Sequence, residues 1–273
     1  MYTLSTEKKL AVISGLIEGN SIRSISRMTD VDRNTINSLL LRTGERCAVL
    51  LDERMRQLPC RRLQCDEIWT YVGKKQRRVR KDDSPELGDQ WVYVALDADT
   101  KLIPAYLVGK RSSENTQAFM MELYRRVADQ RIQLTTDAYV FYTKAVEQSF
   151  AGSVDYAQLK KLYGDYGQHG NERYSPNPIM EVISRTISGV PDPAHVSTSF
   201  VERQNLTIRM QMRRFTRLTN AFSKKLANLK AAVALHFAHY NFCRVHSSLR
   251  VTPAMAAGLT NEIWPLENLL TEA

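Results

Sequence analysis

The chain of 273 residues has only four cysteines, and no two of them form a CxxC pair. Cys47, Cys60, Cys65 and Cys243 therefore predict neither a disulfide framework nor a zinc ribbon. The sequence also lacks an apolar run near the about 18 residues that a membrane-spanning helix needs, and MYTLSTEKKLAVISG is not a signal peptide. These absences favour a protein of the reducing cytoplasm with no membrane partner.

Acidic residues are outnumbered by basic ones: the chain has 29 Asp and Glu against 38 Lys and Arg, for a net charge of +9. An excess of cations favours a polyanionic partner, and nucleic acid is the commonest one. The apolar fraction of 43% is ordinary for a globular protein. The length allows one sizeable domain and a smaller one beside it.

The first 43 residues carry apolar side chains at helical spacing, which predicts three short helices. Helix, short turn and helix in this order is the helix-turn-helix plan, whose later helix enters the major groove of DNA. Small three-helix units also serve as protein-docking modules, so that alternative stays open. The outward residues of the third helix that can contact bases or phosphates are Arg33, Asn34, Asn37, Ser38 and Arg42.

A connecting helix or linker is predicted over 44–61, and beyond it the pattern changes to strands at 63–72, 90–96 and 102–108. The turn between the first two strands contains KKQRRVRK, with six cations. A charge run of this kind is either a solvated loop or a hairpin tip that grips a DNA backbone. The candidate DNA-binding residues of this turn are Lys74, Lys75, Arg77 and Arg78.

The rest of the chain predicts a helix, a strand ending at Asp137, a second helix and one more short strand at 154–156. We interpret 160–196, which is rich in Gly, Pro, Tyr and polar residues, as an insertion of loops and short helices. A later helix carries Glu202. The catalytic domain would then cover 62–222, and 223–273 would form a C-terminal helix and tail.

This order of elements predicts an α/β domain of the ribonuclease H type, with a mixed sheet flanked by helices, behind a small all-α domain. The first strand is then central and the fourth lies beside it, so Asp66 and Asp137 can meet. Glu202 is the only acid between Ala194 and Leu259 and can join them from a helix. Converging carboxylates need a cation, and oxygen ligands suit Mg²⁺ or Mn²⁺. A pair of such ions would clamp a phosphodiester displacement.

The stretches CDEIWTYVGKK, TTDAYVFY and FVERQNLTIRMQMRRFTRLTNAFSKK resemble the three catalytic blocks of DDE transposases of the insertion sequence one family, which belong to the ribonuclease H-like superfamily. NSIRSISRMTDVDRNTINSLLLRTG resembles their helix-turn-helix. The resemblance implies that Asp66, Asp137 and Glu202 form the catalytic metal-binding triad, holding two ions. It also implies a prokaryotic, nucleoid-associated enzyme that binds terminal inverted repeats, then cleaves and joins DNA strands as a dimer or larger synaptic complex.

The sequence departs from this family at both ends. Members often begin with a cysteine zinc-finger module, which is absent here, and HYNFCRVHSSLRVTPAMAAG is more similar to the tails of integrase-like insertion-sequence transposases. Two other functions also fit the residues. One is a structure-selective DNA nuclease of the same fold, and the other is a domesticated DNA-binding regulator that no longer cuts. The intact acids weigh against the regulator.

Several residues compete with these assignments. Glu67 points to the opposite strand face from Asp66, which favours a structural or supporting role. Glu181 is the main alternative to Glu202 as third acid. His236, His239 and Cys243 share one helical face, but neighbouring aromatic residues favour a packed core there over a zinc site.

After Glu202 the chain has seven cations and no acid from Arg203 to Lys225, both ends included. Beside a metal site that must hold DNA, such a face favours phosphate contacts over simple solvation. The candidate DNA-binding residues on this segment are Asn205, Arg209, Arg213 and Arg214.

Overall fold

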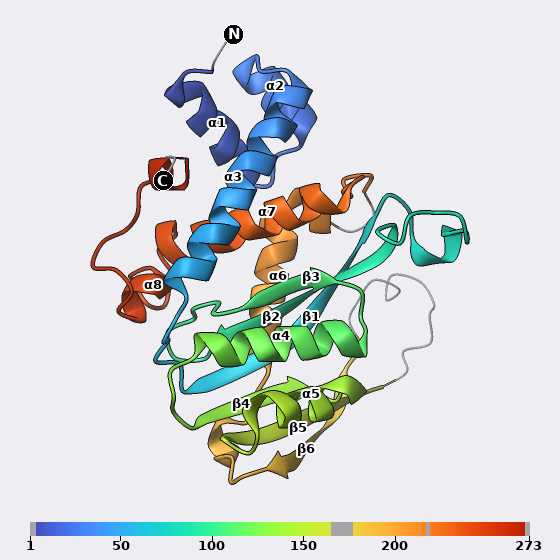
Figure 1. Ribbon diagram of the computed structural model, residues 1–273, viewed down its shortest axis with the longest axis vertical. Helices are drawn as coiled ribbons and strands as arrows, with labels where there is room; N and C mark the ends of the chain where they lie inside the picture. The colour runs from blue at the N-terminus through green and yellow to red at the C-terminus, as the bar shows by residue number, and fades with distance from the viewer. Residues whose placement is uncertain (1–3, 165–176, 217–218, 271–273) are drawn as a thin grey trace.

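A mixed six-stranded sheet is the centre of the fold, as the ribbon of the computed structural model shows (Figure 1). The structure describes residues 4–164, 177–216 and 219–270. In spatial order the strands are β3 (Tyr106–Gly109), β2 (Gly88–Asp97), β1 (Arg62–Val72), β4 (Ile132–Asp137), β5 (Val154–Tyr163) and β6 (Ile179–Ser188).

The first three strands form an antiparallel meander, and β1, β4 and β5 run parallel to one another. The first five strands thus stand in the ribonuclease H order that the sequence predicts, with β1 central. Two helices, α4 (Ser113–Arg126) and α5 (Val140–Phe150), pack together over one face of the sheet, and α6 (Ser199–Gln211) lies on the other (Figure 1). The mixed sheet flanked by helices is confirmed.

The segment 160–196 differs from the prediction, because much of its described part forms strand, beside loop residues and one short 3₁₀ turn, Pro193–His195. β5 runs on to Tyr163, and β6 pairs antiparallel with it at the edge of the sheet. Most side chains of β6 are exposed, among them Met180, Val182 and Ile183. An edge strand with little burial lacks the clear apolar alternation from which a strand is predicted. The neighbouring Gly- and Pro-rich residues favoured the prediction of loops instead. Part of this segment, 165–176, lies outside the described residues.

The N-terminal helices are α1 (Thr6–Ile17), α2 (Ile22–Thr29) and α3 (Arg33–Arg54). Ser21 and Asp32 cap α2 and α3, accepting hydrogen bonds from the backbone N–H groups of Ser24 (3.0 Å) and Asn34 (2.8 Å). Each cap satisfies a backbone N–H group in the first turn of its helix and so fixes where that helix begins. The three predicted helices are present, and their binding to DNA stays a prediction.

The third helix is longer than predicted, because α3 continues from Arg33 through Gly44 to Arg54 without a break. Gly44 lies where α3 crosses α7 (Leu226–Ala238): a Cβ at this position would be 2.4 Å from the carbonyl oxygen of Ala231. The glycine therefore permits a close helix crossing and does not end the helix.

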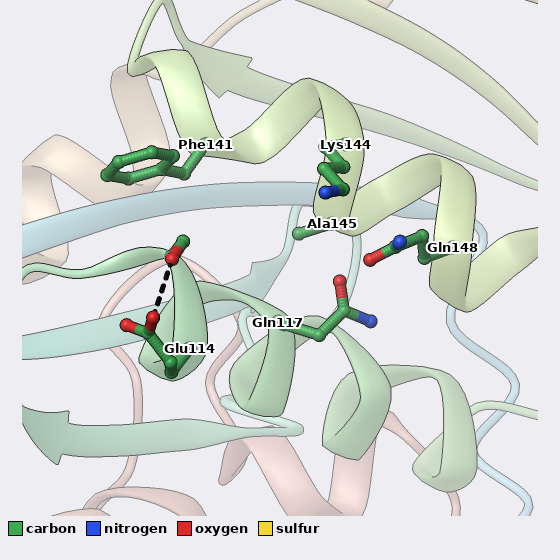
Figure 2. Close-up of a pocket in the computed structure, with 7 residues that line it drawn as sticks. Glu114, Gln117, Phe141, Lys144, Ala145 and Gln148 are labelled. Carbon is green, nitrogen blue, oxygen red and sulfur yellow. Dashed lines mark hydrogen bonds between the residues drawn. The ribbon is translucent and has the colours of Figure 1, made fainter.

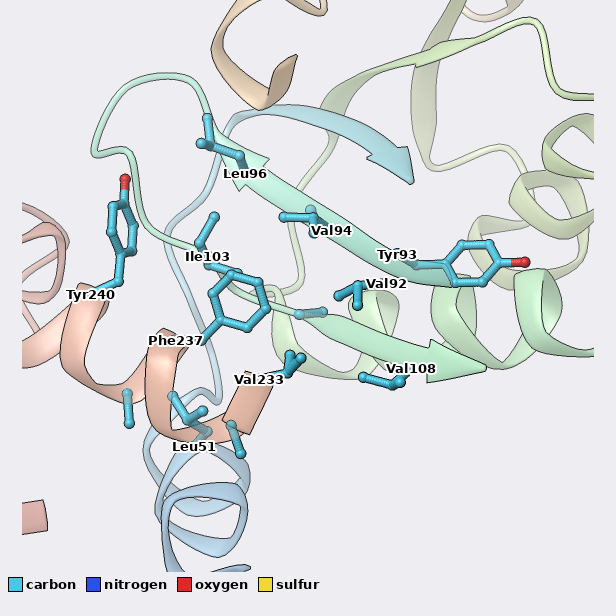
Figure 3. Packing of buried hydrophobic residues seen from close by; sticks show 14 of the residues in the cluster. Leu51, Val92, Tyr93, Val94, Leu96, Ile103, Val108, Val233, Phe237 and Tyr240 are labelled. Carbon is cyan, nitrogen blue, oxygen red and sulfur yellow. The ribbon is translucent and has the colours of Figure 1, made fainter. Parts of the chain in front are cut away.

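This crossing joins the N-terminal helices to the central sheet. Leu51 of α3, Val233 and Phe237 of α7, and Val92 of β2 share one apolar cluster (Figure 3). The chain continues from α7 into a π-helical turn, His239–Cys243, then through α8 (Pro253–Ala256) to a last turn, Leu266–Leu269, which contacts α1 and α3. No helix in the described part of the chain is both long and apolar enough to cross a membrane.

Candidate active site

The site begins where β4 stops short of its neighbour β1. The two parallel strands pair from Arg62 opposite Gln133 to Cys65 opposite Thr136, so the next positions on each are Asp66 and Asp137. β4 ends at Asp137, whereas β1 continues to Val72. Beyond this point β1 has no parallel partner on that side. Side chains from both faces of β1 can therefore reach the same space at its open edge.

Three carboxylates converge at this edge. Asp66, Glu67 and Asp137 each place one oxygen so that all three oxygens lie within 4.8 Å of one another. The structure thus brings Asp66 and Asp137 together, as the strand order predicts. It also adds Glu67, for which we expected a structural role on the opposite face. Alternation along β1 is preserved, but the end of β4 lets both neighbours reach one site.

Asp66 is held by two hydrogen-bond donors. The backbone N–H of Glu67 donates to Oδ1 (2.8 Å), and Nδ2 of Asn205 on α6 donates to Oδ2 (2.8 Å). Burial raises the pKa of Asp66 to about 6, with repulsion from Asp137 and Glu202 adding to the rise and the two donors opposing it. The carboxyl group is therefore positioned by neutral donors, and it forms no ion pair with a cation in the described part of the chain.

Glu67 has a resident cation instead. Its side chain is 1% exposed, and Oε2 lies 3.0 Å from Nη2 and 3.2 Å from Nε of Arg111. Burial is the main reason that the pKa of Glu67 is raised to about 7, and repulsion from Asp137 is the second. The other oxygen, Oε1, is buried and makes no hydrogen bond of good geometry with the described residues, although the nearby hydroxyl of Tyr142 opposes the rise in the pKa of Glu67. A buried acceptor with so little hydrogen bonding is costly, and the salt bridge to Arg111 at the other oxygen offsets part of that cost.

Arg111 is itself fixed by aromatic rings. Its guanidinium lies 3.8 Å from the ring centre of Tyr139 and 4.9 Å from that of Trp91. Nη2 is also 3.7 Å from Oδ2 of Asp137, which accepts a 3.0 Å hydrogen bond at Oδ1 from the backbone N–H of Tyr139. Burial raises the pKa of Asp137 while Arg111 lowers it. One arginine thus holds two of the three acids.

Glu202 lies in the first turn of α6, beside the cluster but not within it. The start of this helix is fixed to β1, because Oε1 of Gln64 accepts from the backbone N–H groups of Phe200 (2.9 Å) and Val201 (3.1 Å). Glu202 is 43% exposed in its side chain, accepts a hydrogen bond from Thr198 (2.7 Å) and pairs with Lys161 of β5. Its charge contributes to the raised pKa values of Asp66 and Asp137.

The alternative third acid, Glu181, is not near this group. It lies opposite Leu162 on the edge strand β6, three strands from β1. Three strand spacings amount to about 14 Å across the sheet. The structure therefore leaves Glu202 and Glu67 as the acids that flank Asp66 and Asp137.

The donor set suits a divalent cation. All ligand atoms are carboxylate oxygens, which Mg²⁺ and Mn²⁺ prefer, and repulsion among buried acids is relieved when a cation binds. Within residues 4–164, 177–216 and 219–270, no other three acidic, His or Cys side chains converge in this way. His236 is instead buried against Phe237 and Tyr240, and burial lowers its pKa to about 3. It packs in an aromatic core, as we expected.

The DNA-binding candidates on α3 differ in exposure. Arg33, Asn34, Ser38 and Arg42 are exposed on one side of the helix. Asn37 is half-buried: its Nδ2 donates to the carbonyl of Arg33 (2.8 Å), and its Oδ1 accepts from Asn228 of α7 (3.4 Å). The first four residues can reach a ligand directly, whereas Asn37 is engaged at the contact between the two helices.

In the β1–β2 connection, Lys75, Arg77 and Arg78 are exposed, and Lys74 is paired with Asp83. Arg77 and Arg78 belong to a short 3₁₀ turn, Gln76–Arg78. This turn extends past the end of the sheet (Figure 1). It therefore presents positive charge away from the core.

The DNA-binding candidates that follow Glu202 also differ in exposure. Asn205 is buried and donates to Asp66, so it supports the acid cluster. Arg209 is half-buried on α6, and Arg213 is exposed. Arg214 donates to Oγ of Ser223 (2.8 Å), and burial lowers its pKa to about 10. Its position favours a structural contact.

The acids lie apart from the pocket between the helices α4 and α5. A shallow pocket of about 180 Å³ lies between α4 and α5, and Figure 2 shows Glu114, Gln117, Phe141 and Lys144 around it. None of its lining residues belongs to the acid cluster. The carboxylates lie at an open sheet edge instead, which suits a large substrate better than a small one.

Sequence reasoning missed Arg111, Lys161 and Gln64. Arg111 and Lys161 lie on other segments of the chain than the acids they contact, and Gln64 accepts from backbone N–H groups of α6 that are 136 and 137 positions away. No spacing in the sequence links these partners. Glu67 did carry a signal in the sequence, because it directly follows the candidate acid Asp66 in a strand rich in apolar residues.

A scan against protein-family models finds no match, and a search of curated proteins finds none either. Solved structures of transposase complexes do resemble the chain. The piggyBac transposase synaptic complex with hairpin DNA has 11% identity and a TM-score of 0.44, over 99% of this chain and 71% of that one. The Mos1 paired-end complex with left transposon end has 13% identity and a TM-score of 0.24, over 55% of this chain and 58% of that one. The mariner Mos1 paired end complex with Mg has 11% identity and a TM-score of 0.28, over 86% and 79%.

Proposed function

We propose that this protein is a DNA transposase that uses a DDE triad. The observation that carries the proposal is the convergence of Asp66, Glu67 and Asp137 at the open edge of β1, with Glu202 beside them on α6. Acids gathered at an exposed edge, on a chain with a net charge of +9, suit phosphoryl transfer on DNA.

Asp66, Asp137 and Glu202 would hold divalent ions, and Lys161 must release Glu202 for this to happen. A bound pair of Mg²⁺ or Mn²⁺ ions supplies Lewis-acid activation of water, or of a DNA 3′-hydroxyl, for attack on a phosphodiester. The chain's own residues keep the acids in place. Asn205 orients Asp66, and Arg111 holds Glu67 against Asp137.

Two exposed basic surfaces would hold the DNA. The outer face of α3 would read the terminal inverted repeats, and the turn with Arg77 and Arg78 would contact the phosphate backbone. Because two transposon ends must be joined to two target phosphates, the active form would be a dimer or a larger synaptic complex. Neither surface requires the acids, so binding and chemistry can be separated by mutation.

The test combines purified protein, DNA carrying its element's ends, a plasmid target and Mg²⁺. Wild-type protein should cleave the ends and join them to the plasmid. Asp66→Asn, Asp137→Asn and Glu202→Gln should each abolish both steps while leaving binding of the ends nearly intact, because the amides keep the shape but weaken metal binding. Cleavage without joining would assign the chain to structure-selective nucleases. Sequence-specific binding without either step would assign it to regulators.

A further inference from the structure

A row of aromatic side chains continues from the acid cluster along β1. Trp69 and Tyr71 follow Glu67 at every second position of β1 and so share its strand face. Their ring centres are 5.7 Å apart. Phe222 extends the row, since its ring centre is 4.7 Å from that of Tyr71. The backbone N–H of Gly73 donates to the carbonyl of Ser223 (2.8 Å), which fixes this segment beside the strand. We refer to Trp69, Tyr71 and Phe222 as the aromatic row.

Core packing does not explain the aromatic row. The opposite face of the same strand is buried, with Ile68 at 1% and Val72 at 0% exposure. Trp69 and Tyr71 are only half-buried: Trp69 stands opposite Trp91 of β2, but the ring contacts found for Trp69 and Tyr71 among the described residues lie within the row. Large aromatic side chains that are left partly in water at the edge of a polar site usually mark a place where something binds.

Positive charge lines this row. Nζ of the exposed Lys75 lies 5.9 Å from the ring centre of Trp69. Arg78 is exposed and close enough to Tyr71 that its charge lowers the pKa of that hydroxyl, against the larger effect of burial. Aromatic faces interleaved with cations form the pattern by which proteins hold single-stranded nucleic acid, because bases stack on the rings while phosphates bind the cations.

The row is also at the right distance from the acids. Trp69 is two residues beyond Glu67, which is about 7 Å along a strand. Stacked nucleotides advance about 3.4 Å each, so this length corresponds to about two nucleotides. A strand whose phosphate lies at the acids would therefore bring a nearby base to Trp69.

We propose that Trp69 and Tyr71 stack on an unpaired base, one or two nucleotides from the reacting phosphate, while Lys75 and Arg78 hold the neighbouring phosphates. This inference rests on the proposed function. The occupant is an unpaired base and not a duplex, because a ring face becomes available for stacking only when the base has left its own stack. The aromatic row would thus select DNA ends that are opened or single-stranded beside the cut.

The experiment compares two short DNAs that differ only in a single-stranded extension at one end, bound to the full chain without divalent metal to prevent cutting. Trp69→Ala should weaken binding of the extended DNA by about tenfold and that of the blunt duplex by less than about twofold. Trp69→Phe should restore most of the loss, since it keeps a stacking face. A 2-aminopurine base in the extension should be quenched by wild type and less so by Trp69→Ala.

Trp264→Phe is the matched control, since Trp264 stacks on Phe242 (4.5 Å) in the C-terminal tail. It should leave both affinities unchanged. Equal affinity of wild type and Trp69→Ala for the extended DNA would overturn the inference, and so would an equal loss for both DNAs. In either case binding and cutting of duplex ends would leave the proposed function standing. Failure of the wild type to bind either DNA would overturn both.

Discussion

The two faces of β1 hold their carboxylates in different ways. Asp66 receives hydrogen bonds from neutral donors, an amide on α6 and a backbone N–H. Glu67, on the other face, is buried against the guanidinium of Arg111. Asp66, whose partners are neutral donors, needs a metal ion to compensate its charge, whereas Glu67 is already compensated by Arg111. From this comparison we predict that Asp66 binds metal and that Glu67 positions Arg111 beside Asp137.

The largest expected effect is therefore the loss of DNA cleavage in Asp66→Asn, which we compare with the smaller loss in Glu67→Gln. Asp66→Asn should reduce DNA cleavage to background. Glu67→Gln keeps the shape and one acceptor for Arg111, so cleavage should fall by only about 10- to 100-fold, as is usual for groups that support a metal ligand. Cleavage rates with Mg²⁺ at equal DNA occupancy measure both. A loss with Glu67→Gln as complete as that with Asp66→Asn would make Glu67 a metal ligand.

Removal of the resident cation should be the next largest effect. Arg111→Ala leaves a buried carboxylate without its partner, which should cost about 1–3 kcal/mol of unfolding free energy. The cost stays moderate because Glu67, with its pKa already raised, can take up a proton. Urea denaturation measures the change. The double variant Arg111→Ala with Glu67→Gln should be more stable than Arg111→Ala alone, and a simple sum of the two losses would show that the pair is not coupled.

The same comparison explains what the sequence could and could not predict. The meeting of Asp66 and Asp137 follows from strand order, which hydrophobic patterning indicates. Glu67 was assigned to the opposite face by alternation along β1, and that assignment was right, but alternation says nothing about where the neighbouring strand ends. The early stop of β4 is what opens the edge to both faces. Arg111 and Lys161 depend on tertiary packing, for which no local signal exists.

The pH dependence of stability should be the third effect. The folded-state pKa of Asp66, about 6, lies above its ordinary value, so the folded chain binds more protons than the unfolded chain between about pH 4 and 7. Stability without metal should therefore fall as pH rises through this window, by up to about 3 kcal/mol from Asp66. Mg²⁺ should raise the melting temperature more at pH 8 than at pH 5, because it compensates the ionised acids.

Thermal melts of wild type with and without Mg²⁺ measure this dependence, and Asp66→Asn is the control. In that variant both the fall with pH and the gain from Mg²⁺ should be smaller. A gain from Mg²⁺ that is the same at pH 5 and pH 8 would separate the metal from these carboxylates.

The smallest effect should come from Lys161, the counter-ion of Glu202. This pair resembles that of Arg111 and Glu67, but Glu202 is 43% exposed, and a solvated ion pair contributes little. Lys161 nevertheless competes with any metal ion for Glu202.

Lys161→Ala should free the acid and lower the Mg²⁺ concentration for half-maximal cleavage by about two- to fivefold, which corresponds to the free energy of an exposed ion pair. Lys161→Arg keeps the charge and should behave like wild type. Mg²⁺ titrations of the cleavage rate decide the point. If Lys161→Ala lowers the maximal rate and leaves the Mg²⁺ requirement unchanged, Lys161 acts on the DNA and not on Glu202.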